Sequence, residues 1–147
     1  MTKTKLALIG AILVVGGSCG NDGSGPEASE LAGTWRATRF EYVSVANSNQ
    51  RLELVALGAV VTVTLTEAGA FTIVVAIPDE PQETFTGTWS ASRDVLTLNR
   101  ASGGGQWQFD MQLSGNTLTL SDANSEFDIN GDDQDEPVKL NMTLARQ

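Results

Sequence analysis

The sequence predicts an all-β protein, an antiparallel up-and-down barrel of eight strands, with a two-sheet β-sandwich as the alternative. From Trp35 onward apolar residues recur at every second position, and helical periodicity is nearly absent. Turn-forming residues interrupt this pattern at short intervals, so that consecutive strands are joined by links of hairpin length. Strict alternation leaves one face of the sheet wet, and closing the sheet on itself removes its exposed edges. A sandwich would need several long connections, and only the acidic segment before the last strand is long enough.

The expected strands follow one another along the chain. The first covers residues 34–45, with a bulge or bend where the apolar phase slips between Ala37 and Phe40. Residues 51–58 suit either a short extended segment or one helical turn. The remaining strands are expected at residues 60–66, 71–77, 83–90, 95–99, 106–114, 117–121, 126–129 and 138–146. Parallel pairing would need crossovers of about a dozen residues, for which the chain has no room.

The amino terminus has the pattern of a secretory signal peptide over residues 1–18. Lys3 and Lys5 precede an apolar stretch, residues 6–15, which is too short to span the hydrocarbon core of a bilayer. Small residues follow, and directly after them stands Cys19, the only cysteine. The segment resembles a bacterial lipoprotein signal peptide with its lipobox. The alternative is an ordinary secretory signal that leaves a free thiol or removes it.

This resemblance implies that Cys19 becomes the first residue of the exported protein and carries the lipid. Several acyl chains together give stable membrane attachment, whereas one chain is marginal. Gly20, rather than aspartate, follows the cysteine, and the resemblance therefore implies the outer membrane, with the protein facing the periplasm or the cell surface. Residues 19–30 are mostly small and polar and are expected to form a flexible tether, which leaves residues 31–147 as the folded domain.

Short motifs in the folded part resemble the lipocalin family. Gly33-Thr34-Trp35 begins the first strand and Arg146 lies in the last one. A second Gly-Thr-Trp strand, at residues 87–89, turns directly into Leu-Thr-Leu at residues 96–98, as in the small lipocalin-like domains of bacterial lipoproteins. The resemblance implies that Gly33, Trp35 and Arg146 close one end of the barrel, with the arginine lying across the indole ring.

Residues 33–39 and 87–93 agree at five positions of seven. A duplication of two half-barrels would explain this repeat. The interpretation that we favour is that two tryptophans meet the same packing need, where glycine lets strands approach closely.

Composition excludes several functions. The chain has no histidine, which removes the commonest general base and the usual zinc ligand, and we therefore expect no enzyme activity and no cofactor. The formal net charge of −9 argues against binding to nucleic acid. Asp-x-Asn-x-Asp at residues 128–132 has the spacing with which calcium loops begin, but Asp133 and Lys139 stand where an EF-hand needs glycine and glutamate. We interpret the acidic segment 128–136 as a solvated turn and predict no metal site.

Two functions remain open. The first is a membrane-anchored, lipocalin-like lipoprotein that binds a small apolar ligand, with Trp107, Phe109 and Met111 lining the cavity. The second is a non-enzymatic interaction or structural module, in which these side chains fill the barrel and the loops engage a protein partner. The two hypotheses differ in the free volume of the interior.

Overall fold

The computed structural model describes residues 25–147, so the predicted signal peptide and Cys19 lie outside the described residues. The described part forms one helical turn and nine strands: α1 (Ala28–Leu31), β1 (Gly33–Ser44), β2 (Arg51–Glu53), β3 (Val60–Leu65), β4 (Ala70–Ala76), β5 (Glu83–Ser92), β6 (Val95–Arg100), β7 (Gln106–Ser114), β8 (Thr117–Phe127) and β9 (Glu136–Arg146). Among these residues no helix has the length and apolar character needed to cross a bilayer.

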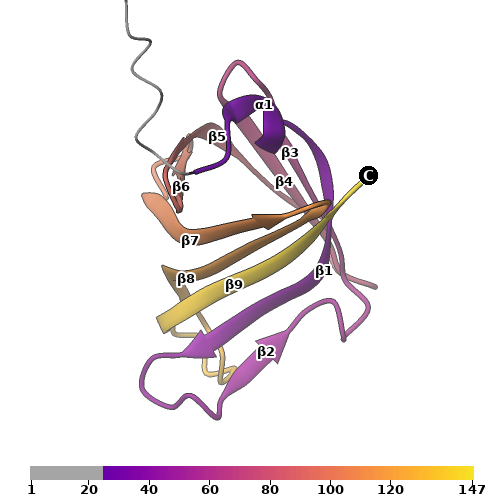
Figure 1. The fold of residues 1–147 in the computed structure, drawn as a ribbon. Helices are drawn as coiled ribbons and strands as arrows, with labels where there is room; N and C mark the ends of the chain where they lie inside the picture. The colour runs from indigo at the N-terminus through magenta and orange to yellow at the C-terminus, as the bar shows by residue number, and fades with distance from the viewer. Residues whose placement is uncertain (1–24) are drawn as a thin grey trace, which may run out of the picture.

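The sheet closes on itself. Strands β3 to β8 each pair antiparallel with the next strand in the chain, and β1 pairs with both β3 and β9 and so closes the barrel. The result is an eight-stranded up-and-down barrel, with β2 as an additional strand on the distal half of β1 (Figure 1). The predicted barrel is confirmed, and the β1–β9 pairing excludes the sandwich alternative.

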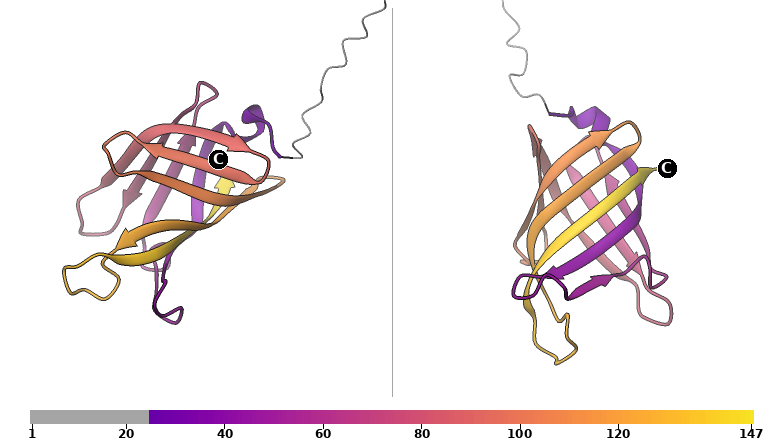
Figure 2. Two further views of the ribbon diagram at one scale, coloured as in Figure 1. Left: turned by 90° about the vertical axis from the view of Figure 1, so that its left-hand side faces the viewer. Right: turned by 60° about the horizontal axis from the view of Figure 1, so that its bottom comes forward.

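The barrel has two ends that carry different structures. The α1 end holds the helical turn, the tight β3–β4, β5–β6 and β7–β8 turns and the carboxyl terminus. At the opposite end, called the far end, lie β2, the β6–β7 loop and the β8–β9 loop. Figure 2 shows the β8–β9 loop projecting away from the molecule on the side opposite α1 in both views.

The two irregular features of β1 and its neighbour agree with the expected pattern. The β1–β9 register shifts between Ala37 and Arg39, which is the bulge that the slip of apolar phase predicted. The ambiguous segment 51–58 begins with the short strand β2, as one alternative expected, and continues as a hydrogen-bonded turn rather than a helix, with the Leu57 N–H donating to the Leu54 carbonyl at 3.1 Å. Glu53 holds this turn through its carboxylate, which accepts three backbone N–H bonds, from Phe40, Val55 and Ala56.

Strand β8 corrects the expectation of separate strands at residues 117–121 and 126–129. It is one continuous strand, and its register with β9 shifts between Leu120 and Ala123. Asp122 adopts a φ of 63°, and its N–H donates to the Asn141 side chain at 2.9 Å. Because the bulge reverses which residues face inward, the alternation breaks in the sequence although the strand continues.

The expected flexible tether also needs a correction at its carboxyl-terminal end. Residues Ala28–Leu31 form the turn α1, in which the Glu27 N–H donates to the Glu30 carboxylate at 2.7 Å. Leu31 is completely buried and belongs to the hydrophobic core. Leu31 was expected in the folded domain, so the difference concerns Ala28–Glu30, which belong to the helical turn on the barrel end, with the Glu30 carbonyl accepting a hydrogen bond from Arg146.

Inward side chains of the barrel strands pack into a single core. Its largest fully buried members come from around the barrel: Trp35, Phe40, Phe71, Phe109, Leu65, Ile73, Leu96, Leu98, Leu118, Leu120 and Leu140, together with Leu31 of α1. Eight strands enclose a space that side chains can just fill. The middle of this barrel is accordingly a packed core, and its ends and rim are the places where a ligand could enter.

Candidate functional site

At the α1 end the structure brings together three residues that the sequence analysis singled out. The Trp35 indole N–H donates to the Leu31 carbonyl at 2.9 Å, and the Arg146 guanidinium carbon lies 4.2 Å from the centre of the Trp35 ring. Arg146 also donates to the Ala32 carbonyl at 3.1 Å and to the Glu30 carbonyl. Gly33 is in the same cluster, since a Cβ there would lie 3.0 Å from Nη1 of Arg146. The hydrogen bonds of the Trp35 and Arg146 side chains end on backbone carbonyls of this chain, and the cluster is therefore described as a structural closure.

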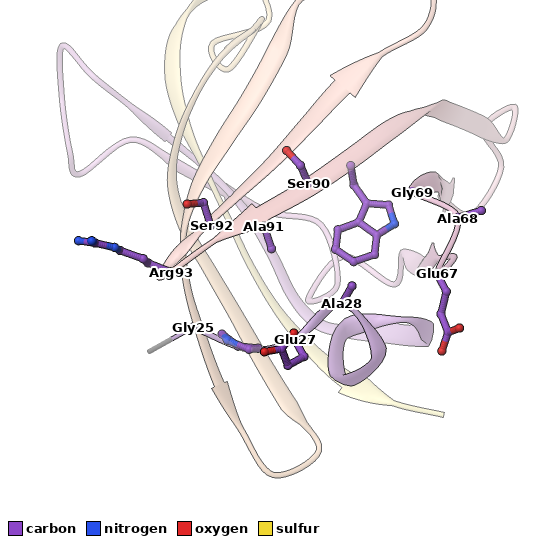
Figure 3. A pocket seen from close by; sticks show the side chains of 12 residues that line it. Gly25, Glu27, Ala28, Glu67, Ala68, Gly69, Ser90, Ala91, Ser92 and Arg93 are labelled. Carbon is purple, nitrogen blue, oxygen red and sulfur yellow. The ribbon is translucent and has the colours of Figure 1, made fainter. Parts of the chain in front are cut away.

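A pocket of about 550 Å³ opens beside this closure, between the segment leading into α1 and the β3–β4 and β5–β6 turns (Figure 3). Its charged side chains are Glu27, Glu67 and Arg93, all of them exposed. Figure 3 shows Glu67 and Arg93 on opposite sides of the pocket. Small-molecule sites need a few convergent polar groups on an apolar surface. This pocket lacks them, and it is not the best candidate.

The far end carries a group of aromatic side chains that face the interior. Tyr42 and Phe127 stack with ring centres 4.3 Å apart and an interplanar angle of 6°. Phe85 meets Trp107 edge to face at 5.4 Å. Phe85 and Phe127 are partly exposed, whereas Tyr42 and Trp107 are buried. These four residues, called the far-end aromatic cluster, offer apolar surface that is only partly covered.

Arg100 lies on this cluster. Its guanidinium carbon is 4.3 Å from the centre of the Trp107 ring. The Gly104 backbone covers the guanidinium closely, because a Cβ at this position would lie 2.9 Å from both Cζ and Nη1 of Arg100. The Nε atom is buried and has no hydrogen-bond acceptor among residues 25–147. A positive group is thus held in a confined place without the partner that buried polar groups normally have.

The pKa of the Tyr42 hydroxyl reflects the electrostatic environment of the cluster. Burial, and secondarily the negative charge of Glu83, raise the pKa of the Tyr42 hydroxyl to about 12, and the positive charge of Arg100 partly opposes them. The hydroxyl is therefore protonated at neutral pH and available as a hydrogen-bond donor.

Beside Arg100 the barrel wall opens as a wedge. Strands β7 and β8 pair from Asp110–Ser121 to Ser114–Thr117. Nearer the far end, the described pairings join β7 only to β6 and β8 only to β9. A hollow of about 760 Å³, called the far-end hollow, lies in this wedge, and its lining includes Arg100, Gln106, Asn124, Ser125, Val138 and Lys139. Ser125 bridges the wedge on the inner side, where its hydroxyl accepts the Trp107 indole N–H at 3.2 Å.

The three residues predicted to line a cavity do not meet around one space. Trp107 lies under Arg100 at the far end, and Phe109 is fully buried in the middle of the core. Met111 lies nearer the α1 end, where it lines a separate hollow with Pro26 and Asp94. All three face inward from β7, but successive inward residues on a strand are about 7 Å apart, and this spacing distributes them along the barrel.

Sequence reasoning missed Arg100, Tyr42 and the covering glycine Gly104. A signal for Arg100 was present, because it continues the inward alternation of Leu96 and Leu98. An arginine in phase with core residues at the end of a strand indicates a charged group at the mouth of a barrel.

The acidic segment closes on itself. Carboxylate oxygens of Asp128, Asp132 and Glu136 lie within 4.8 Å of one another. Asp128 accepts the N–H groups of Gly131, Asp132 and Asp133 at 2.6–3.1 Å. Glu136 accepts the Ile129 N–H at 3.1 Å. These contacts give the carboxylates a role in shaping the β8–β9 loop.

Comparison with known proteins agrees with this architecture. The family model of the lipocalin-like domain matches residues 31–120, which is more than half of the chain. No curated protein matches the chain.

Proposed function

The chain belongs to the lipocalin-like domain family, and from this we propose that it is a non-enzymatic barrel that binds one small, largely apolar molecule at its far end. The far-end hollow carries this proposal. Its volume of about 760 Å³ falls in the range of about 300–1,000 Å³ that small-molecule pockets have. Val45 and Pro137 supply exposed apolar surface, and Arg100 and Ser125 supply polar groups.

This proposal places the ligand at the rim and not in the centre of the barrel. The central positions are filled by side chains such as Leu98, Phe109 and Leu118, which are fully buried. A ligand in the wedge would contact Ser125 and, beneath it, the far-end aromatic cluster. Near the far end β7 and β8 do not pair with each other. They can therefore separate more easily there than where hydrogen bonds join neighbouring strands.

Isothermal titration calorimetry with 1-decanol, a neutral apolar probe, tests the proposal. We expect saturable binding to the purified protein with one molecule per barrel. Gln106→Trp fills the hollow from an exposed position on β7 and should weaken binding at least about tenfold, which corresponds to 1.4 kcal/mol. Gln112→Trp is the matched control, because Gln112 is exposed on the same strand near the α1 end. Absence of binding, or an equal effect of both variants, would contradict the proposal.

We further propose that a lipid on Cys19 anchors the protein to the outer membrane, facing the periplasm or the cell surface. Gly25, the first described residue, lies beside the β5–β6 turn at the α1 end, because a Cβ on it would overlap the Arg93 carbonyl. An anchor preceding this point leaves the far end free for a ligand. The intact mass of protein extracted from membranes tests the anchor: the lipid mass should be present in the natural chain and lost in Cys19→Ser. An unmodified thiol in the natural chain would refute it.

The second candidate function, a filled barrel that engages a protein partner through its loops, is favoured by the packed core and by three exposed apolar side chains, Val45, Leu57 and Val60. They lie at or near the far end, on or next to loops. The decanol titration separates the two functions, because the interaction module requires no small-molecule binding.

A further inference from the structure

Two arginines lie on tryptophan rings in this barrel, and their remaining contacts differ. Arg146 over Trp35 donates to the carbonyls of Ala32 and Glu30. Arg100 over Trp107 makes no hydrogen bond through its side chain and no ion pair within the described residues. The first arrangement is complete in itself. In the second, Trp107 and Gly104 enclose the Arg100 guanidinium, but residues 25–147 provide no hydrogen-bond acceptor for it.

This difference matters because the charge of an arginine cannot be removed. The guanidinium keeps its proton throughout the accessible pH range and presents five N–H donors in a rigid fork. Enclosing such a group between Trp107 and Gly104 costs free energy unless an acceptor or a negative charge compensates. A planar fork on an aromatic ring is also the arrangement that binds carboxylate or phosphate oxygens in two parallel hydrogen bonds.

The glycine-rich β6–β7 loop is built around this guanidinium. Residues 102–105 read Ser-Gly-Gly-Gly, and a Cβ on the central Gly104 would collide with Arg100. Gly103 and Gly105 flank it with φ values of 73° and 77°. A short loop of this kind can shift to uncover the Nε edge when a ligand arrives.

The charges around the far-end hollow define the ligand further. Two positively charged side chains, Arg100 and Lys139, line the hollow. The Lys139 ammonium already donates a hydrogen bond to the Asn124 side chain at 2.6 Å. Two exposed carboxylates, Glu126 and Asp135, also line the hollow and repel a highly charged anion. The exposed side chains of Val45 and Pro137 offer apolar contact in the same space. This combination of charged and apolar side chains favours a ligand that carries one negative charge on an otherwise apolar molecule.

We propose that Arg100 binds the head group of an amphipathic monoanion, an aliphatic carboxylate, whose apolar chain lies in the far-end hollow. This inference rests on the proposed function and names the class of its ligand. Arg100 supplies the charge-assisted hydrogen bonds, Trp107 fixes the plane of the guanidinium, and Gly104 leaves the room that this plane requires.

Calorimetric titration with decanoate, 1-decanol and decyl phosphate at neutral pH tests the assignment. Decanoate should bind about tenfold or more tightly than decanol. Arg100→Met should remove this advantage while leaving the affinity for decanol within about threefold, and Arg100→Lys should retain part of it. Arg93→Met, which changes an exposed arginine in the pocket at the α1 end, is the control and should change neither affinity. The melting temperature of each variant shows whether it is folded.

The outcomes separate the two levels of the proposal. Equal binding of decanoate and decanol, or an anion preference that survives Arg100→Met in a folded protein, would overturn the assignment of Arg100 and leave the apolar site standing. Tighter binding of decyl phosphate than of decanoate would overturn the choice of a monoanion. Failure of all three probes to bind would overturn both the assignment and the proposed function.

Discussion

Arg146 and Arg100 show how the same pair of residue types can serve different purposes. Each guanidinium lies about 4 Å from the centre of an indole ring, at 4.2 and 4.3 Å. Arg146 connects the last strand to the residues around α1 through backbone carbonyls, and it therefore contributes to stability. Arg100 has no such connections within the described residues, and its replacement should affect binding more than folding.

Replacing Arg146 tests the structural half of this contrast. Arg146→Met removes a cation–π contact, worth about 0.5–2 kcal/mol, and two hydrogen bonds to carbonyls. We expect the free energy of unfolding to fall by about 2 kcal/mol or more in urea titrations. Arg93→Met is the matched control and should change it by less than about 0.5 kcal/mol, since Arg93 is exposed. Equal effects of the two variants would contradict the role of Arg146 in closure.

The ionisation of Tyr42 reports on the environment at the far end without interference, because Tyr42 is the only tyrosine in the chain. Its pKa is about 12 in the folded protein, against 10.0 for an unperturbed tyrosine. The ultraviolet absorbance of tyrosinate should therefore rise with a midpoint near pH 12 in the folded state. A midpoint near 10 in a protein that is still folded would show that the hydroxyl is solvated.

The same shift makes stability depend on pH. Between about pH 10 and 12 the unfolded chain has lost the Tyr42 proton and the folded protein has kept it, so that the unfolded state binds fewer protons. Stability is therefore retained below pH 10 and falls as the pH rises through this window, by about 2–3 kcal/mol in total. Tyr42→Phe should lack this loss when unfolding is measured at pH 9 and at pH 11. An identical pH dependence in the two proteins would contradict the assigned burial.

Glycine governs how closely two of the strands approach. Gly87 of β5 pairs with Arg100 of β6, and a Cβ on Gly87 would lie 1.8 Å from the carbonyl oxygen of the preceding residue, Asn99. Gly87 therefore belongs to its Gly-Thr-Trp motif for a steric reason. In the first such motif, the Cβ of a residue at position 33 would meet the flexible Arg146 side chain. The two glycines thus have different neighbours, while both tryptophans, Trp35 and Trp89, donate to backbone carbonyls.

Replacing Gly87 tests this steric requirement. Gly87→Ala should lower the free energy of unfolding by about 2–3 kcal/mol, because the β5–β6 ladder must shift to accept the methyl group. Gly115→Ala is the comparison: its Cβ meets open space, and the cost of about 1 kcal/mol comes only from its φ of 59°. A smaller loss at Gly87 than at Gly115 would contradict the close approach.

Where a strand keeps one apolar face from end to end, the sequence was sufficient to predict it. Strands β7 and β9 have this property and appear with nearly the predicted bounds. The bulge at Asp122 was missed, because residues 121–126 contain a single apolar residue, Ala123, and such a stretch looks the same in the sequence as a break between two strands. The turn α1 was also missed, since the burial of Leu31 depends on Trp35 and the barrel end, which local composition does not reveal.

The candidate site was less predictable than the fold for a related reason. Alternation indicates that Trp107, Phe109 and Met111 face inward, but it does not tell which of them meets free volume. That depends on where β7 and β8 separate, and their separation depends on pairing between distant segments. Likewise, the missing acceptor of Arg100 is a property of all the strands that surround it.

The whole chain combines an acidic, histidine-free composition with a barrel whose ends are specialised. The α1 end is closed by Trp35 and Arg146 and receives the segment that leads from the predicted lipid anchor. The far end carries the aromatic cluster, Arg100 and the wedge. In the proposed function the ligand and the lipid anchor lie at opposite ends, with the packed middle of the barrel between them.

Nuclear magnetic resonance of the three tryptophan indole N–H groups can locate a ligand within this arrangement. Trp35 and Trp89 donate to carbonyls at the α1 end, and Trp107 donates to Ser125 at the far-end hollow. Titration with decanoate should shift the Trp107 signal, which Trp107→Phe identifies, and leave the other two in place. A shift confined to Trp35 or Trp89, or no shift at saturating decanoate, would contradict ligand binding at the far end.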